Sequence, residues 1–171
     1  MENLIPLVGF VRVYPGAMKP ERMTKKSACY DVFCFITPEV GTIKMYDVYD
    51  NEFKIPVTEN KFVIPPFARA LIPTGCKFRI PDGHSIRLHP RSGNALKRYL
   101  TLPNCEGIID SDYPEQTYAL IANNTFVPKP ILHLERVCQM ELIPVVEFQL
   151  VDEEDFGQVT DRVSGLGSTG A

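Results

Sequence analysis

Short runs of β-forming residues, separated by turn signals, recur along most of the chain. Cys76-Lys77-Phe78-Arg79-Ile80, for example, alternates apolar and basic side chains and ends at the turn sequence Pro81-Asp82-Gly83. The 15 prolines are scattered, and proline at this density disfavours a helical bundle. The pattern therefore predicts an all-β sandwich or barrel. Predicted strands lie at residues 8–13, 29–36, 62–64, 68–72, 76–80, 85–88, 118–122, 138–146 and 148–151.

One segment has a helical pattern instead. Residues 92–100 contain the helix-forming run Asn-Ala-Leu-Lys-Arg-Tyr, and Ser92 is the predicted N-cap. The preceding Pro90-Arg91-Ser92-Gly93 places an arginine, a hydroxyl and a glycine N–H at the start of this helix, where unpaired N–H groups attract phosphate. Ordinary helix capping by Ser92 explains the same residues, and the two interpretations are compatible.

The length of 171 residues suits one domain. After the acidic run Asp152-Glu153-Glu154-Asp155, the strand pattern ends and the chain becomes rich in glycine and serine. We predict a β domain over residues 1–151 and a C-terminal arm with a glycine-rich tail over residues 152–171. A flexible terminus is one interpretation of Gly165-Leu166-Gly167-Ser168-Thr169-Gly170. A phosphate cradle is the other, with backbone N–H groups, the hydroxyls of Ser168 and Thr169, and Arg162 upstream as donors.

Charge and cysteine content exclude several classes of protein. The net charge of −3 makes a nucleic-acid-coating surface improbable. Five cysteines without a Cys-x-x-Cys pair argue against a disulfide framework or a zinc site, and favour buried thiols in a reducing compartment. Met1-Glu2-Asn3 lacks the basic start of a signal peptide, and no apolar run approaches the ~20 residues of a membrane span. We therefore expect a cytoplasmic protein.

The most informative chemistry lies at residues 107–113. The short apolar run Gly107-Ile108-Ile109 predicts a strand, and Asp110-Ser111-Asp112-Tyr113 predicts a tight turn after it. Two carboxylates and a phenol at one turn can bind a ligand that presents a water molecule and a hydroxyl to the carboxylates and a flat ring to the tyrosine.

Five motifs in order make the chain resemble the trimeric dUTP diphosphatase (dUTPase) family. They are Ser27-Ala28-Cys29-Tyr30-Asp31-Val32, Pro90-Arg91-Ser92-Gly93, Asn104 to Tyr113, Glu135-Arg136-Val137-Cys138-Gln139, and Arg162 to Gly170. The resemblance implies a jelly-roll-like β-barrel with a mobile C-terminal tail. It also implies Mg²⁺-assisted hydrolysis of dUTP to dUMP and pyrophosphate, which lowers dUTP and supplies dUMP for thymidylate synthesis.

The resemblance also implies roles for individual residues. Asp110 would orient the water that attacks the α-phosphorus, and Tyr113 would lie under the deoxyribose and exclude a 2′-hydroxyl. Asp112 is the less favoured base, and Arg136 is either functional or part of a structural ion pair. Asp31 would contact Mg²⁺ through a water. Uracil would be read by Asn104 and the main chain of an Asn104–Tyr118 hairpin at Gly107 and Ile109. The phosphates would contact Arg91, Ser92, Gly93, Gln139, Arg162, Gly167, Ser168 and Thr169, with Leu166 over the base.

The family resemblance predicts a homotrimer whose sites are shared. The first, second and fourth motifs would come from one chain, the third from a neighbour, and the fifth from the remaining chain. Two departures stand out: Leu166 replaces an aromatic residue in a fifth motif that is one residue short, and Pro114-Glu115 replaces a glycine-containing turn.

Residues 41–62 look like an insertion relative to compact family members. Met45 to Asn51 predicts a hairpin, which we interpret as an elaborated surface loop. The alternative is an arm that docks a protein partner through exposed tyrosine and methionine side chains.

Two other functions stay open from the sequence. A dCTP deaminase or bifunctional relative would need a catalytic glutamate after the third motif, for which Glu115 is thin support. A weakly catalytic binding protein switched by nucleotide is conceivable because the fifth motif is altered.

Overall fold

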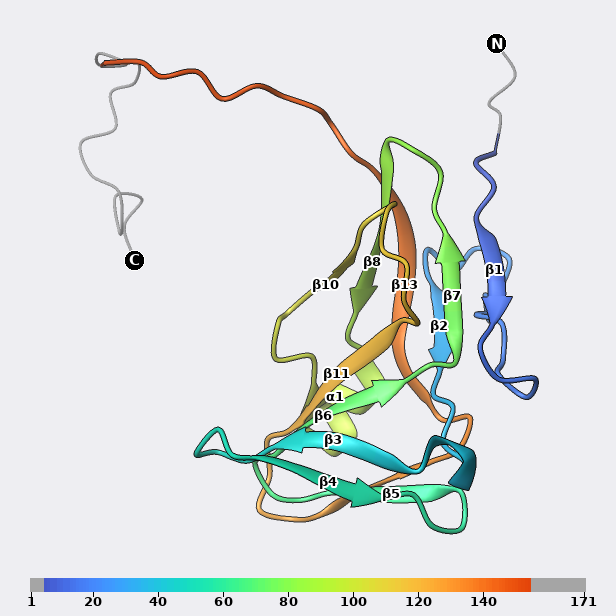
Figure 1. Ribbon diagram of the computed structural model, residues 1–171, viewed down its shortest axis with the longest axis vertical. Helices are drawn as coiled ribbons and strands as arrows, with labels where there is room; N and C mark the ends of the chain where they lie inside the picture. Colours follow the sequence, from blue (N-terminus) through green and yellow to red (C-terminus); the bar gives the residue numbers. More distant parts are fainter. Residues whose placement is uncertain (1–4, 155–171) are drawn as a thin grey trace.

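The structure, a computed structural model that describes residues 5–154, is built mainly of antiparallel β-strands (Figure 1). The elements are β1 (Gly9–Arg12), β2 (Tyr30–Phe33), the 3-10 helix η1 (Pro38–Val40), β3 (Thr42–Tyr46), β4 (Glu52–Pro56), β5 (Lys61–Ile64), β6 (Arg69–Pro73), β7 (Cys76–Arg79), β8 (His84–His89), α1 (Ser92–Arg98), β9 (Leu100–Thr101), β10 (Gly107–Ile109), β11 (Tyr118–Asn123), β12 (Lys129–Leu132) and β13 (Arg136–Pro144).

Two larger sheets form the body of the molecule. One has the strand order β10-β8-β13-β2 and the other β4-β3-β6-β11-β9, while β1-β7 and β12-β5 form two-stranded sheets. Apolar side chains from both larger sheets meet in one core, which confirms the all-β prediction; each such side chain contributes about 1.5–3 kcal/mol when fully buried. Fully buried members include Val32, Ile36, Ile43, Met45, Ile72 and Ile86.

The predicted helix is present, but its ends differ from the prediction. It begins with Ser92 as its first helical residue, and the N-cap is Arg91, with no side-chain capping hydrogen bond. The prediction of Ser92 as N-cap was therefore wrong. The helix ends at Arg98 because Tyr99 adopts a left-handed conformation with φ of 56°. The buried amide of Asn94 ties α1 to β13 by donating to the carbonyls of Arg136 at 3.2 Å and Val137 at 3.5 Å.

The predicted hairpin within residues 41–62 is formed by β3 and β4. The carboxylate of Asp47 holds its turn by accepting from the N–H groups of Tyr49 at 2.8 Å and Asn51 at 3.0 Å. However, β3 also pairs with β6 in the interior of the five-stranded sheet and buries Ile43 and Met45. The interpretation as a surface loop was wrong for this strand, because its alternate side chains fill the core.

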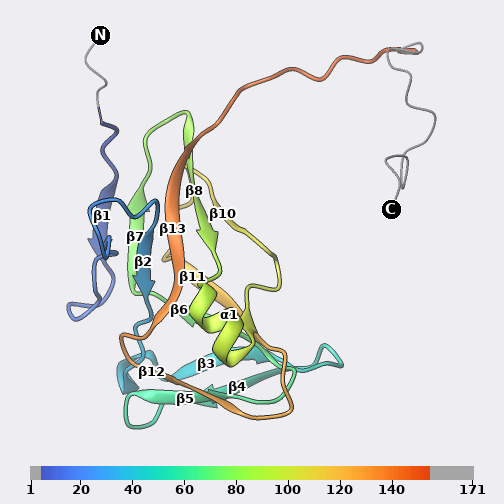
Figure 2. The ribbon, with the colours of Figure 1, turned by 180° about the vertical axis from the view of Figure 1, so that it is seen from behind.

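The segment that follows β13 leaves the body of the molecule (Figures 1 and 2). The strand predicted at residues 148–151 is absent, because this part of the described chain has no neighbouring strand to pair with. Its apolar side chains are exposed: Val145, Val146, Phe148, Leu150 and Val151. The domain boundary at residues 151/152 stays a prediction.

All five cysteines are free thiols. Cys34, Cys76 and Cys138 are buried as predicted, whereas Cys29 is half-buried and Cys105 is exposed, so the prediction of buried thiols was wrong for Cys105. Burial raises the pKa of Cys34 and of Cys138 to about 12. Between residues 5 and 154, no helix is long and apolar enough to span a membrane.

Candidate active site

Asp31 is the centre of a polar cluster in which its carboxylate accepts four hydrogen bonds from three side chains. Its carboxyl group is only 3% exposed. Arg91 Nε donates to Oδ1 at 3.0 Å and Arg91 Nη2 to Oδ2 at 3.4 Å. Gln139 Nε2 donates to Oδ1 at 3.2 Å and Arg136 Nη1 to Oδ2 at 3.0 Å. The structure thus brings together residues from three of the predicted motifs.

The charge state of Asp31 follows from these contacts. Burial of the carboxyl group acts to raise its pKa. Hydrogen bonds from Arg91 and Gln139, together with the positive charges of Arg91 and Arg136, outweigh burial and hold the pKa of Asp31 below its ordinary value. Asp31 is therefore a carboxylate at neutral pH.

Strand register explains why these side chains share one face. Asp31 of β2 pairs with Gln139 of β13, so the two side chains lie on the same side of the sheet. Arg136 would point to the opposite side in a regular strand, because it lies three residues from Gln139. A β-bulge between Arg136 and Cys138 adds one residue and turns Arg136 toward Asp31. The contact confirms an ion pair for Arg136, one of the two roles left open above.

Ser92 and Gly93 follow Arg91 at the start of α1 and are exposed. A Cβ atom added to Gly93 would meet nothing within 4 Å, so packing within the described chain does not require glycine there. The space beside this residue is open to a ligand.

The turn after β10 holds the second group of predicted residues. Asp110 is exposed, and its carbonyl accepts from the N–H of Tyr113 at 3.2 Å, which closes the turn. The hydroxyl of Tyr113 donates to the carbonyl of Gln116 at 3.3 Å. Gln116 in turn accepts from the N–H of Gly75 at 3.1 Å and so anchors the turn to the body. Burial raises the pKa of Tyr113, which is 38% exposed.

The predicted Asn104–Tyr118 hairpin is not formed. β10 pairs with β8 in the four-stranded sheet, whereas β11 pairs with β6 and β9 in the other sheet. Residues 110–117 therefore connect two sheets. Gly107 packs closely against Leu88: a Cβ there would lie 3.1 Å from Cβ of Leu88, so the leucine would have to shift by a few tenths of an ångström. The side chain of Ile109 packs against the core. As an edge strand, β10 leaves main-chain groups free on the side away from β8.

The Asp31 cluster and the Asp110 turn lie at opposite ends of β8. Ile109 pairs with Ile86 near the start of β8, so Asp110 lies beside Ser85, whereas Arg91 follows the end of the strand. Figures 1 and 2 show β8 running toward α1. The chain takes six residue steps from Ser85 to Arg91, four of them within β8, and an extended chain of this length spans ~20 Å. Four cavities of about 300–400 Å³ are present between residues 5 and 154. None of them is lined by Asp110 or Tyr113, or by Asp31, Arg91 or Gln139.

A family model described as dUTPase matches residues 43–170, which is most of the chain. The chain belongs to the dUTPase family. It is 38% identical over 113 residues to the deoxyuridine 5′-triphosphate nucleotidohydrolase of Finegoldia magna, covering 66% of this chain and 79% of that one.

Solved dUTPase structures share the fold. A mutant dUTPase of Staphylococcus bacteriophage 80alpha with dUpNHpp matches with a TM-score of 0.74 and 22% identity, over 96% of this chain and 99% of that chain. A mutant dUTPase from phage phi11 of S. aureus, described as revealing the coordination of a structural Mg(II) ion, matches with a TM-score of 0.66 and 20% identity, over 88% of this chain and 98% of that chain.

Within this dUTPase chain, the structure therefore forms two separate groups of predicted site residues. Asp31, Arg91 and Gln139 are in direct contact, with Ser92 and Gly93 next to Arg91. Asp110 and Tyr113 form the turn at the far end of β8, while Asn104 lies in the loop before β10 and is exposed. The predicted residues Arg162, Leu166, Gly167, Ser168 and Thr169 lie outside the described residues.

Proposed function

We propose that the chain hydrolyses dUTP to dUMP and pyrophosphate. The observation that carries this proposal is the match of residues 43–170 to the dUTPase family model. It is reinforced by relatives named deoxyuridine 5′-triphosphate nucleotidohydrolase, such as the 38% identical protein of Finegoldia magna. The reaction removes dUTP and supplies dUMP for thymidylate synthesis. The names of these relatives favour dUTP hydrolysis over the two alternatives, a dCTP deaminase or a weakly catalytic binding protein.

Asp110 is the residue that we assign to the attacking water. An exposed carboxylate at a closed turn can accept a hydrogen bond from water and take up its proton as the bond to the α-phosphorus forms. Tyr113, whose hydroxyl is held by Gln116, presents a ring of fixed position for the deoxyribose. A ring packed under the sugar leaves no room for a 2′-hydroxyl.

Uracil is assigned to the edge of β10. The main chain of this edge strand, between Gly107 and Ile109, and the exposed amide of Asn104 offer donors and acceptors in fixed positions. A base with the opposite hydrogen-bonding pattern would leave these groups unpaired, which disfavours cytosine.

The phosphates are assigned to Arg91, Ser92, Gly93 and Gln139. The guanidinium of Arg91 and the amide of Gln139 are already in one cluster, and both are oriented by Asp31. A guanidinium held in this way offers a preorganised fork for phosphate oxygens. The open space at Gly93 allows close approach of the backbone to an anion.

We propose that each site is shared between chains of a homotrimer. The separation of ~20 Å between Arg91 and Asp110 along β8 supports this, since one chain does not bring them together. The exposed apolar side chains of residues 145–151 also support it, because they suit burial against another copy.

Mg²⁺ is the proposed cofactor, bound mainly by the triphosphate. Both oxygens of Asp31 already accept two hydrogen bonds each, so this carboxylate offers no bare oxygen for direct ligation. Asp31 would instead contact the ion through a metal-bound water. This water would donate to a carboxylate oxygen in place of one arginine N–H group. Mg²⁺ keeps several waters in most protein sites, and when bound it neutralises charge on the phosphate oxygens.

Three further assignments stay predictions. The fifth motif would close over the nucleotide, with Arg162, Gly167, Ser168 and Thr169 toward the phosphates and Leu166 over uracil. The cytoplasm stays the predicted location. A protein partner at residues 41–62 is supported only by the exposed side chains of Val48 and Tyr49 at the hairpin turn, because Met45 is buried.

The proposal is tested with the purified full-length chain and Mg²⁺, presented in turn with dUTP, dCTP, dTTP and UTP. Release of pyrophosphate and ammonia is measured for each nucleotide. We expect pyrophosphate from dUTP alone. Ammonia from dCTP, or an inert protein that still binds dUTP, would replace the proposed function by one of the two alternatives.

A further inference from the structure

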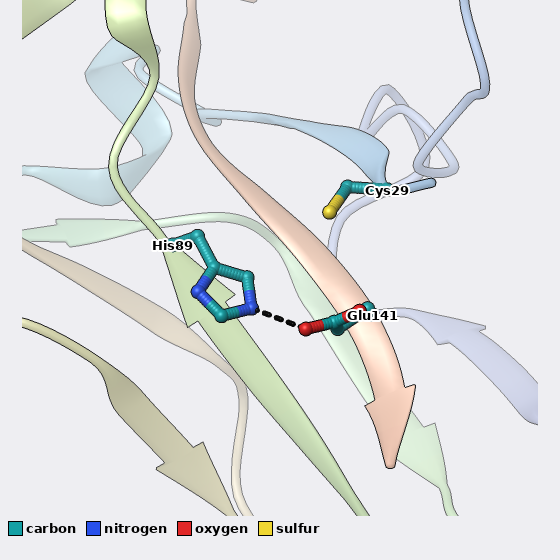
Figure 3. Close-up of side chains that lie close together, drawn as sticks. All are labelled: Cys29, His89 and Glu141. Carbon is teal, nitrogen blue, oxygen red and sulfur yellow. Dashed lines mark hydrogen bonds and ion pairs between the residues drawn. The ribbon is translucent and has the colours of Figure 1, made fainter. Parts of the chain in front are cut away.

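Cys29, His89 and Glu141 meet on the sheet face that also carries Asp31 (Figure 3). Their ligand atoms all lie within 4.8 Å of one another, and all three residues are half-buried. His89 Nε2 lies 2.8 Å from Glu141 Oε1. Thiol, imidazole and carboxylate are the three side-chain ligand types that proteins use for zinc.

The strand register shows that this grouping follows from the fold. Gln139 of β13 pairs with His89 of β8 on one side and with Asp31 of β2 on the other. Glu141 is two residues after Gln139 on β13 and therefore shares this face. Cys29 lies in the bend directly before β2, and its sulfur comes within 4.8 Å of the other two ligand atoms. Two neighbouring strands and the bend before a third therefore each contribute one metal-ligating side chain.

A fourth side chain orients the histidine. Glu106 Oε1 lies 3.5 Å from Nδ1 of His89, the ring nitrogen that does not face Glu141. Metal-binding histidines commonly donate the second ring N–H to a carboxylate, which fixes the tautomer and directs the other nitrogen to the metal. Arg87 Nη1, 3.5 Å from Glu106 Oε2, completes this chain of contacts.

Glu141 has no lysine or arginine partner between residues 5 and 154, where its one ion pair is with His89. A metal ion bound here would pair with this carboxylate and displace the proton of the Cys29 thiol.

We infer that Cys29, His89 and Glu141 bind one transition-metal ion of the Zn²⁺ type, beside the Asp31 cluster. Bonds of about 2.0–2.3 Å to a tetrahedral ion separate its ligands by roughly 3.3–3.8 Å, so shifts of about 1 Å complete the site. The sulfur and nitrogen ligands select Zn²⁺ over Mg²⁺, which prefers oxygen. Three protein ligands leave the fourth position for water or another ligand. The inference does not depend on dUTP hydrolysis, and it departs from the expectation, drawn from the cysteine spacing, that a zinc site is improbable.

The test is calorimetric titration of the metal-stripped, full-length protein with Zn²⁺. One ion should bind per chain, and excess Mg²⁺ should not displace it. Cys29→Ser, His89→Asn and Glu141→Gln should each weaken binding at least tenfold, and Glu106→Gln should weaken it about tenfold. Cys105→Ser and His84→Asn are the matched controls, because they change a thiol and an imidazole outside the cluster, and they should bind Zn²⁺ as the unaltered chain does.

Binding of Co²⁺ in place of Zn²⁺ gives a second test. It uses the unaltered protein, so it does not depend on whether a variant folds. The unaltered protein should show a thiolate-to-cobalt charge-transfer band, which reports a sulfur ligand directly. A titration without saturable binding at one ion per chain would mean that His89 and Glu141 form an ordinary hydrogen bond and nothing more. Unchanged binding in Cys29→Ser, or loss of binding in Cys105→Ser, would equally overturn the assignment.

Discussion

Asp110 and Arg91 of one chain lie at opposite ends of the β8–β10 pair, about 20 Å apart along the strands. Asp110 follows β10 where that strand pairs with the start of β8, and Arg91 follows the end of β8. The residue assigned to the attacking water and the residue assigned to the phosphates therefore act on one nucleotide only if they come from different chains.

Asp110→Asn should lower kcat by about 100-fold to 10,000-fold, because the amide cannot accept the water proton. Nucleotide affinity should change little, since Asp110 is exposed and holds no other part of the fold through its carboxylate. Steady-state kinetics and calorimetry with a non-hydrolysable dUTP analogue measure the two effects. Asp112→Asn, two residues away and also exposed, is the matched control and should keep most of its activity. Robust turnover by Asp110→Asn would assign the base to another residue.

Co-expression of two inactive variants tests the sharing of sites. Gly93→Asp should abolish activity by placing a carboxylate at the phosphates, while Gly93→Asn should retain part of it. Neither change should affect folding, because a Cβ at this position meets nothing within 4 Å.

Mixed trimers of Gly93→Asp and Asp110→Asn chains should recover roughly a quarter of the unaltered activity, because about one site in four then combines two intact residues. Separately purified variants mixed without subunit exchange are the control. Mixed trimers without recovered activity would show that one chain supplies both residues.

Asp31→Asn should destabilise the protein by about 3 kcal/mol near neutral pH, because two arginines lose their shared carboxylate. The pKa of Asp31 is lower in the folded protein than its ordinary 3.8. Its stabilisation is therefore complete above the ordinary pKa and is lost as the pH falls through the folded pKa. Urea unfolding at several pH values measures the free energy of unfolding of the unaltered protein and of Asp31→Asn. The difference between them should narrow below about pH 4; a constant difference would contradict the charge-based origin of the effect.

The β3–β4 hairpin should tolerate loss of its turn but not of its first strand. Replacing residues 47–51 by Asn-Gly should shift the melting temperature by no more than about 3 °C, because a two-residue turn suits this pairing. Removing residues 41–62 should abolish folding, because Ile43 and Met45 leave the core. Circular dichroism distinguishes the two. A folded, trimeric protein without residues 41–62 would restore the interpretation of this region as a surface loop.

Leu166→Phe should lower KM for dUTP about twofold to tenfold if residue 166 lies over uracil, because an aromatic ring adds a stacking contribution of about 0.5–1.5 kcal/mol. Leu166→Ala should raise KM for dUTP, because it removes apolar side-chain surface that would pack over uracil. Kinetics at saturating Mg²⁺ compare the three proteins. Unchanged or poorer binding by the phenylalanine variant would show that residue 166 lies elsewhere.

Local pattern predicted much of this molecule. The alternation of residues 76–80 gave β7, and the apolar run before Asp110 gave β10, because a half-buried strand shows its two faces directly in sequence. The motif residues Asp31, Arg91 and Gln139 were also identifiable from short stretches of chain. Cys29, His89 and Glu141, the residues proposed to bind a metal ion, each lie two residues from one of these motif residues.

Only the tertiary structure decided which of these faces meet. The carboxylate of Asp31 contacts Arg91 and Arg136, which are 60 and 105 residues away in the sequence. A β-bulge that the local sequence did not predict turns Arg136 toward Asp31. The central place of β3, the absence of a partner strand for residues 148–151 and the separation of Asp110 from Arg91 depend in the same way on sheet order. A sequence period shows which side of a strand is apolar, but pairing between distant strands sets which side chains become neighbours.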